Sequence, residues 1–207
     1  MLDTLDNIKE IVLKKKIIII GVGIVLVLGL LFGSIYITIL NNNDKKELLN
    51  NVSIYFDDFK NITFQDKLNI FKESFIKNII YFLLIWLLGI SIIGFPIILI
   101  MIFYKSFLLG FSISSIFAKY KVGGLYKILI YILPSKIILI ILTIFLAIFS
   151  INLSNKLINS CIKKKTFNFN AYMGKYFLLL IICILACVIT SLIDAFIMPF
   201  FYKLKLW

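Results

Sequence analysis

The sequence contains no histidine and no arginine, and only 15% of its 207 residues are charged. Without histidine, a Ser-His-Asp triad cannot form and a zinc site has few ligands to draw on. Without arginine, the chain lacks the side chain that binds phosphates through two parallel hydrogen bonds. The formal charge of +12 therefore does not indicate nucleic-acid binding. Lysines lying between hydrophobic runs are instead typical of anchoring at lipid headgroups.

Other groups that carry chemistry are also scarce. Of the three cysteines, Cys183 and Cys187 lie in one apolar run, Cys161 lies apart, and none forms a CxxC pair, so we expect apolar packing. Asp194 is the only acid within the predicted spans, whereas an intramembrane aspartyl protease needs two. No GxxxxGK[ST] motif is present. We expect no catalytic residue, no cofactor, no metal site and no enzymatic activity.

Hydrophobic residues, in contrast, make up 62% of the chain, and the mean hydropathy is +1.07. A soluble domain is about 45–50% apolar and about 25% charged. A surface this poor in charge suits lipid and not water. The composition therefore predicts an all-α polytopic integral membrane protein with the lipid bilayer as its surroundings.

The first uncharged run covers residues 17–40 and is long enough to cross a bilayer as a helix. The polar segment 1–16 before it ends in three lysines, which the positive-inside rule places in the cytoplasm. A cleaved signal peptide is the rival interpretation. Its apolar region would be shorter, about 7–15 residues, and would end at small residues, whereas this run ends at three asparagines.

Residues 41–78 form a loop, expected to be extracytoplasmic, with six lysines and six acids. Thr63 and Asp66 fit a capping box and predict a helix start. This helix either lies along the membrane surface or extends the next span. Apolar residues in it recur at spacings of four, three, four and four: Phe64, Leu68, Phe71, Phe75 and Ile79.

Residues 79–199 are predicted to form a helical membrane domain, followed by a tail, 200–207. The run 79–104 contains Pro96, which predicts a kink. Two short runs within 106–134 predict one broken or re-entrant element. If this element crosses, there are about five transmembrane helices, with the amino terminus inside and the carboxyl terminus outside; if it is re-entrant, there are four. The expected elements are 79–104, 106–134, 137–155 and 176–198.

Small residues in the spans suggest close helix contacts. Gly29 and Gly33 form a GxxxG motif, which either drives helix pairing or is a chance occurrence in a glycine-tolerant helix. Gly110 and Ser114 form a second small-xxx-small pair. Self-association of the protein through Gly29 and Gly33 is left open.

Asp194 needs a physical reason, because a charge at the bilayer centre costs at least about 2.5–3.5 kcal/mol on insertion scales. It is a proton or ion ligand, or it bonds to another helix, or it lies near the interface, since Pro199 follows five residues later. A single carboxylate favours the last two explanations over transport.

Several short motifs occur in a characteristic order along the chain: 71–78 (FKESFIKN), 89–96 (GISIIGFP), 105–111 (KSFLLGF), 123–124 (GG), 133–134 (LP) and 194–199 (DAFIMP). With these motifs the sequence resembles the stage II sporulation protein M family. Asp194 replaces the usual glutamate of the family pattern, and Ser106 stands where glycine is common, but the other motif positions follow it. Together with the GxxxG motif, these motifs give the following structural or interaction candidates: Asn78, Gly94, Pro96, Gly110, Gly123, Gly124, Pro134, Asp194, Pro199, Gly29 and Gly33.

The resemblance implies a noncatalytic membrane scaffold for peptidoglycan remodelling, acting in septal wall thinning and forespore engulfment during sporulation. Its implied partners are peptidoglycan hydrolases, an amidase and a lytic transglycosylase, either extracytoplasmic or membrane-anchored. Its implied location is the sporulation septum and the engulfing membrane. Loop 41–78, with Tyr55, Phe56 and Phe59, is either the docking surface or a solvated linker. The alternative function is a small transporter or permease subunit that uses the broken element and Asp194.

Overall fold

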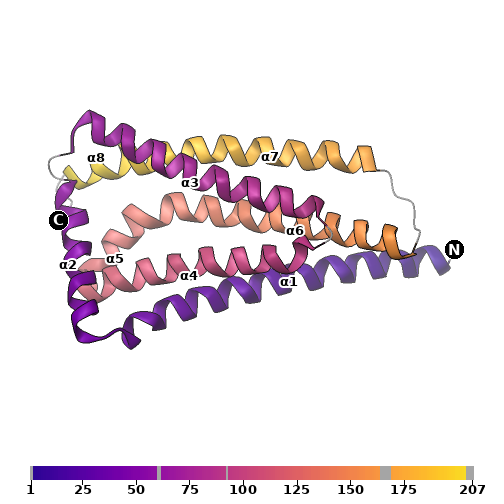
Figure 1. Cartoon of the computed structure of the whole chain (residues 1–207), viewed down its shortest axis with the longest axis horizontal. Helices are drawn as coiled ribbons and strands as arrows, with labels where there is room; N and C mark the ends of the chain where they lie inside the picture. Colours follow the sequence, from indigo (N-terminus) through magenta and orange to yellow (C-terminus); the bar gives the residue numbers. More distant parts are fainter. Residues whose placement is uncertain (1, 60–61, 92, 164–168, 204–207) are drawn as a thin grey trace.

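The computed structural model describes residues 2–59, 62–91, 93–163 and 169–203, and every regular element in these ranges is helical (Figure 1). The predicted all-α class is therefore confirmed. In chain order the elements are α1 (Leu2–Ile39), α2 (Asn42–Asp58), α3 (Phe64–Ile90), α4 (Gly94–Tyr120), α5 (Val122–Lys127), the π-helix η1 (Ile128–Ile132), α6 (Leu133–Lys163), α7 (Phe169–Leu192), the π-helix η2 (Ile193–Ile197) and α8 (Met198–Lys203).

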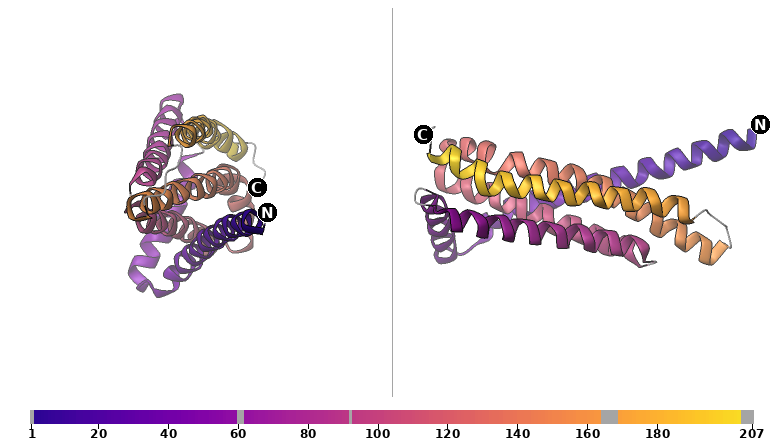
Figure 2. Two further views of the ribbon diagram at one scale, coloured as in Figure 1. Left: turned by 90° about the vertical axis from the view of Figure 1, so that its right-hand side faces the viewer. Right: turned by 90° about the horizontal axis from the view of Figure 1, so that it is seen from above.

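The long helices run side by side as one bundle, and α2 lies across one end of it (Figures 1 and 2). That end, here called the α2 end, also holds α5 and α8. The opposite end holds the start of α1 and the turn between α3 and α4. The amino-terminal part of α1 projects beyond the bundle there (Figure 2). With the amino terminus predicted inside, the α2 end is predicted to be extracytoplasmic.

Within the described ranges, five helices are long and apolar enough to cross a membrane, so the predicted number is confirmed. The boundaries of these helices differ from those expected. The expected span 79–104 is divided between α3 and α4, and the expected element 106–134 is divided between α4 and the segment that leads into α6. The candidate spans are Lys16–Ile39, Phe64–Ile90, Gly94–Tyr120, Val122–Ser160 and Tyr172–Phe201.

The prediction of one kinked span over 79–104 is wrong. Helix α3 ends at Ile90, with Ser91 as its C-cap, and Gly94 begins α4. Pro96 therefore lies in the first turn of a new helix, where its missing N–H leaves no internal hydrogen bond unmade. The turn is tight, since a Cβ on Gly94 would overlap the Leu88 carbonyl. Proline here marks a helix start and not a kink.

The prediction of one broken or re-entrant element over 106–134 is also wrong. The segment is interrupted at Lys121, where the backbone has φ 50°. Its first run, however, completes α4, and its second run continues through α5 and η1 into α6. Each run was too short to cross alone, but each joins an apolar neighbour in a full span. At Gly124 an added Cβ would lie 2.9 Å from the Ile116 carbonyl oxygen, so α5 packs closely on α4.

Residues 64–78 are the first half of the continuous helix α3, so of the two interpretations the extension of the next span is right and the surface helix is wrong. The capping box is present: the Thr63 side chain accepts from the Asp66 N–H, and the Asp66 carboxylate accepts from the Thr63 N–H at 3.0 Å. The helix that lies across the bundle end is α2. Its Phe56 and Phe59 are buried against Ile116 and Ile128.

The centre of the bundle is a core of apolar side chains from α3, α4, α6 and α7, including Ile85, Leu146 and Cys183. Two hydrogen bonds of the buried Tyr176 side chain connect α7 to α3 and α6 within this core. The Tyr176 hydroxyl donates to the Trp86 carbonyl at 2.8 Å and shares a hydrogen bond of 2.7 Å with the Ser150 hydroxyl. This core fills the bundle towards its opposite end and leaves a hollow at the α2 end.

Candidate functional site

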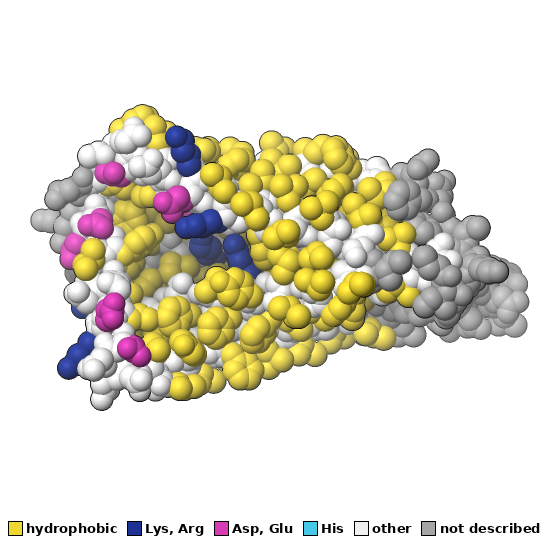
Figure 3. Space-filling model, in the orientation of Figure 1, with side chains coloured by type: hydrophobic (Ala, Val, Ile, Leu, Met, Phe, Trp, Pro, Cys, Tyr) yellow, Lys and Arg dark blue, Asp and Glu magenta, His cyan; other side chains and the backbone are white. Residues whose placement is uncertain are grey.

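A cavity of about 960 Å³ lies beneath α2, enclosed by parts of α1, α3, α4, η1, α6 and η2. Figure 3 shows it from the side of the bundle as a hollow behind α2, with lysine side chains inside and acidic side chains around it. Cavities of about 300–1,000 Å³ are the usual size of small-ligand sites. Most of its wall is apolar, so the few polar groups in it decide what it can bind.

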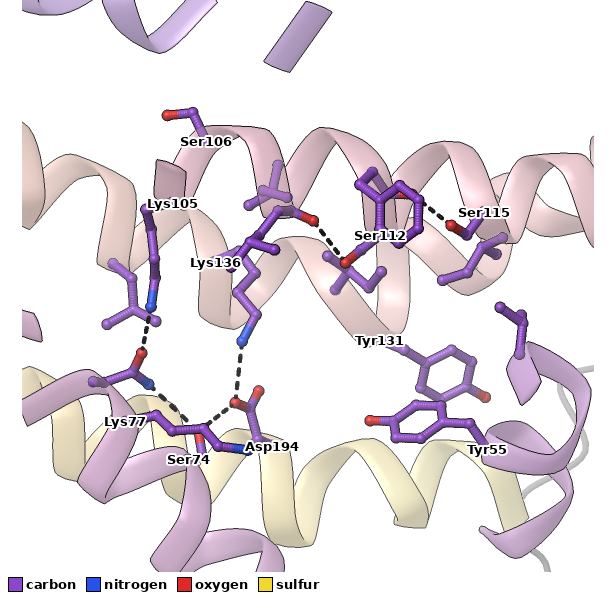
Figure 4. A pocket seen from close by; sticks show the side chains of 18 of the residues that line it. Tyr55, Ser74, Lys77, Lys105, Ser106, Ser112, Ser115, Tyr131, Lys136 and Asp194 are labelled. Carbon is purple, nitrogen blue, oxygen red and sulfur yellow. Dashed lines mark hydrogen bonds and ion pairs between the residues drawn. The ribbon is translucent and has the colours of Figure 1, made fainter. Parts of the chain in front are cut away.

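Five polar side chains from four elements form one chain of contacts in this cavity (Figure 4). Asp194 of η2 accepts from the Ser74 hydroxyl at 2.8 Å and from the Lys136 ammonium at 3.5 Å. The Asn78 amide donates to the Ser74 hydroxyl at 3.4 Å. The Lys105 ammonium, on α4, donates to the Asn78 amide oxygen at 3.0 Å. Every hydrogen bond in this chain of contacts is donated towards Asp194: one path runs from Lys105 through Asn78 and Ser74, and the other runs directly from Lys136.

The charges in this polar chain do not balance. It holds two ammonium groups, Lys105 and Lys136, and one carboxylate, Asp194. Among the described residues no carboxylate lies within ion-pair distance of Lys105, whose other contact is the face of the Tyr81 ring at 4.8 Å. Both contacts of Lys105 are with neutral groups. The inner wall of the cavity therefore carries one uncompensated positive charge.

The two π-helices place Asp194 and Lys136. Each ends two residues before a proline: η1 before Pro134 and η2 before Pro199. A proline inside a helix lacks the N–H donor, and its ring crowds the carbonyl four residues back. A locally wider π-turn relieves that crowding and rotates the residues around it. Lys136 follows the first of these turns and Asp194 lies in the second, so the ion pair joins two irregular helix segments.

The mouth of the cavity has the opposite charge. Asp44 and Glu47 of α2 line it, and Glu73 of α3 is paired at 3.1 Å with Lys77. The Glu73–Lys77 pair is on the surface, with the two side chains 71% and 74% exposed. The site is thus acidic towards α2 and basic at its inner end.

Only two of the candidates predicted from the sequence, Asn78 and Asp194, line the cavity. Ser74, Lys105 and Lys136 also line the cavity but are not among the predicted candidates. Each of these lysines stands at the edge of an apolar run, which is typical of a span boundary. The requirement that Asp194 have a partner was the available signal. Gly94 and Pro96 lie in the first turn of α4, Gly124 lies against α4, Gly123 faces open space, and Pro134 and Pro199 follow the π-turns.

The remaining candidates, Gly29, Gly33 and Gly110, form the contact between α1 and α4. A Cβ on Gly33 would overlap the Phe107 carbonyl, and one on Gly110 would overlap the Leu30 carbonyl. Gly29 faces Ser106, 2.7 Å from an added Cβ, so the α4 partner of the GxxxG motif is Ser106–Gly110 and not Gly110–Ser114. The motif packs within the chain, and α4 covers these glycines.

The cavity is also lined by Ser112 and Ser115, whose hydroxyls are engaged by their own helix. Ser112 donates to the Leu108 carbonyl at 2.8 Å and Ser115 to the Phe111 carbonyl at 2.7 Å. In the described part of the chain, no serine is hydrogen-bonded to a lysine as a nucleophile and its base would be. The arrangement suits the binding of an anion better than bond cleavage.

Comparison with known proteins adds one finding. A family model described as "Stage II sporulation protein M" matches residues 19–199, which is most of the chain and covers three of the five spans in full and nearly all of the first and last. No curated protein and no solved structure matches.

Proposed function

We propose a function from one premise, which the match over residues 19–199 shows: the chain belongs to the stage II sporulation protein M family. It is therefore a multi-pass membrane protein related to sporulation. More specifically, we propose a noncatalytic scaffold that holds peptidoglycan hydrolases, an amidase and a lytic transglycosylase, at the septum and the engulfing membrane. There it would support septal wall thinning and engulfment of the forespore.

The observation that carries this proposal is a fixed helix outside the spans. On one face of α2, Phe56 packs edge-to-face on Tyr120 and Tyr131, and the Lys127 ammonium lies 4.6 Å from the centre of its ring. On the opposite side, Ile54 is 49% exposed, and between the two faces Tyr55, which borders the cavity, is 59% exposed. A helix held by its own bundle and presenting apolar side chains outward is suited to binding a partner with little loss of conformational entropy.

The test is capture of partners from the membranes of sporulating cells, with the tagged full chain as bait and mass spectrometry as the readout. We expect wild type to bring down wall hydrolases. Ile54→Glu with Tyr55→Glu should abolish their recovery, because two charges would replace the apolar contact surface. Asn43→Glu is the matched control: it adds an acid to the exposed first turn of the same helix, where the helix dipole favours it.

Unchanged recovery from the double variant would exclude α2 as the docking surface. Absence of hydrolases from the wild-type sample would overturn the scaffold itself. Membrane insertion of each variant, checked by extraction and size-exclusion chromatography, separates loss of binding from loss of folding.

A transporter or permease subunit remains a second candidate, on one observation. Asp194 lies in a chain of polar side chains along a cavity inside the bundle, as proton and ion pathways often do. The broken helix that also favoured transport is absent, since 106–134 is divided between two spans. Under this hypothesis Asp194→Asn would abolish the flux of protons or ions across the membrane of proteoliposomes and leave partner capture intact. Unchanged flux, or no flux in wild type, would remove it.

A further inference from the structure

We propose that the cavity beneath α2 binds the headgroup phosphate of one anionic membrane phospholipid, which enters from the side of the bundle between α3 and α4. Lys105 and Lys136 would contact the phosphate. This inference goes beyond the scaffold function and does not depend on it.

The first support is the unbalanced charge of the inner wall. Lys105 is half-buried, and among the described residues its ammonium group has two contacts, the Asn78 amide oxygen and the Tyr81 ring. The Lys136 ammonium lies 3.5 Å from the Asp194 carboxylate, which is a long distance for an ion pair, and the same carboxylate oxygen also accepts from Ser74. An ammonium group away from water and without an anion is unfavourable, and a phosphate oxygen between the two lysines would form charge-assisted hydrogen bonds with both.

The second support is the direction in which the cavity opens. In Figure 3 the hollow is visible from the side of the bundle, a face that looks towards lipid in a membrane. Helices α3 and α4 meet at their tight turn and diverge towards the α2 end (Figure 1). Their apolar side chains, such as Ile70 and Leu108, line the cavity on its two sides. A lipid molecule can reach the lysines without leaving the bilayer.

The third support is the level of the membrane surface on this side. Glu73 and Lys77 are exposed on α3 and directly precede Ser74 and Asn78, so the polar surface of the bilayer must reach this level. From Asn78 to Ile90 there remain 13 residues, about 20 Å of helix, against about 30 Å for a hydrocarbon core. Such a mismatch is accommodated by local thinning. Headgroups beside α3 would then lie at the depth of Lys105.

Exposed apolar side chains continue from this level towards the opposite end and would contact the acyl chains of the bound lipid. They recur every three or four residues along the outer faces of the two helices that border the opening. They are Ile80, Leu84 and Leu87 on α3, and Ile97, Ile100 and Tyr104 on α4.

The acidic mouth distinguishes a lipid from a free anion. Phosphate arriving from water at the α2 end would pass Asp44 and Glu47 before it reached Lys105. Like charges along that path disfavour a soluble anion. A lipid that enters sideways between α3 and α4 passes Glu73, whose charge is paired with Lys77, and need not cross the α2 end past Asp44 and Glu47, so we assign the site to a membrane phospholipid.

The test uses the purified full chain in detergent, titrated with phosphatidylglycerol and separately with phosphatidylcholine of the same acyl chains, with native mass spectrometry of the bound state. We expect one phosphatidylglycerol per chain and at least about tenfold weaker binding of phosphatidylcholine. Lys105→Gln should weaken phosphatidylglycerol binding by about tenfold, and Lys105→Arg should restore it. Lys105→Gln breaks no ion pair, so we expect it to fold. Lys121→Gln, an exposed lysine at the α4–α5 turn, is the control of equal charge loss and should bind as wild type does.

Equal binding of both lipids, or equal loss in the Lys105 and Lys121 variants, would overturn the proposal, because apolar contact or net charge would then explain the binding. Displacement of the lipid by inorganic phosphate at millimolar concentration would instead identify a site for free anions. A thermal melt of each variant shows whether Lys105→Gln remains folded; if it does not, Lys105→Arg against Lys105→Met decides between charge and packing.

Discussion

Asp194→Asn is expected to lower the thermal midpoint of the protein in detergent by about 6–12 °C. The carboxylate is 12% exposed and Lys136, its partner, is 35% exposed. Breaking a buried ion pair costs about 3–5 kcal/mol, and partial exposure of Lys136 places this pair near the lower limit. For a chain of this size about 3 kcal/mol corresponds to this shift in midpoint. Circular dichroism at 222 nm during heating measures it.

Two further variants serve as controls for the Asp194→Asn result. Asp194→Glu restores the charge and should recover most of the midpoint. Glu73→Gln breaks a different ion pair, Glu73–Lys77 within α3, whose side chains are exposed and which is worth only about 0–1 kcal/mol. A midpoint unchanged in Asp194→Asn would show that the Asp194–Lys136 ion pair contributes little to stability, which would favour the transporter hypothesis over a structural ion pair.

The depth of a charged residue was the part of the site that the sequence did not reveal. A lysine between apolar runs usually marks a span boundary, and Lys105 and Lys136 were interpreted in that way. In the fold, Lys105 is the twelfth residue of α4 and points into a cavity. The acid was easier to find, because Asp194 stood alone in a long apolar run. Its partner depends on which helices pack together, and that information is not local.

The number of spans followed from composition, whereas their ends depended on two backbone features. A proline within an apolar run, such as Pro96, is compatible both with a kink inside one helix and with the first turn of a new helix. Only the contact of Gly94 with Leu88 shows that the chain reverses direction there. Lys121 adopts a positive φ without being glycine, so no turn signal marked it. The π-turns before Pro134 and Pro199 likewise could not be inferred from proline alone.

The two proposals place different demands on the same end of the bundle. A partner bound to the exposed face of α2 would lie over the acidic mouth, whereas the lipid would occupy the basic inner end from the side. Because Leu48, Val52 and Tyr55 of α2 line the same cavity, a lipid in it would lie beside the helix that presents the docking face. Lys105→Gln in the partner-capture assay therefore measures whether the two sites are coupled.

Gly33→Leu is expected to detach α1 from α4 and to lower the thermal midpoint by about 6–12 °C. An added Cβ would overlap the Phe107 carbonyl, and backbone cannot rotate away as a side chain can. Overpacking costs about 1–3 kcal/mol where side chains can adjust, and a clash with backbone lies at the upper limit. The loss should spread along the contact, since Ser34 also donates to the Gly110 carbonyl at 3.4 Å. A thermal melt in detergent measures the change.

Gly23→Leu is the matched control for this variant, because an added Cβ at Gly23 meets nothing within 4 Å. It makes the same chemical change in the same helix, and leucine favours a helix over glycine by up to about 1 kcal/mol, so its midpoint should not fall. Equal midpoints for the two variants would contradict the α1–α4 contact. Light scattering then distinguishes the remaining explanation: if Gly29 and Gly33 pair two copies of the chain, Gly33→Leu would convert a dimer to a monomer, whereas packing within one chain leaves the mass unchanged.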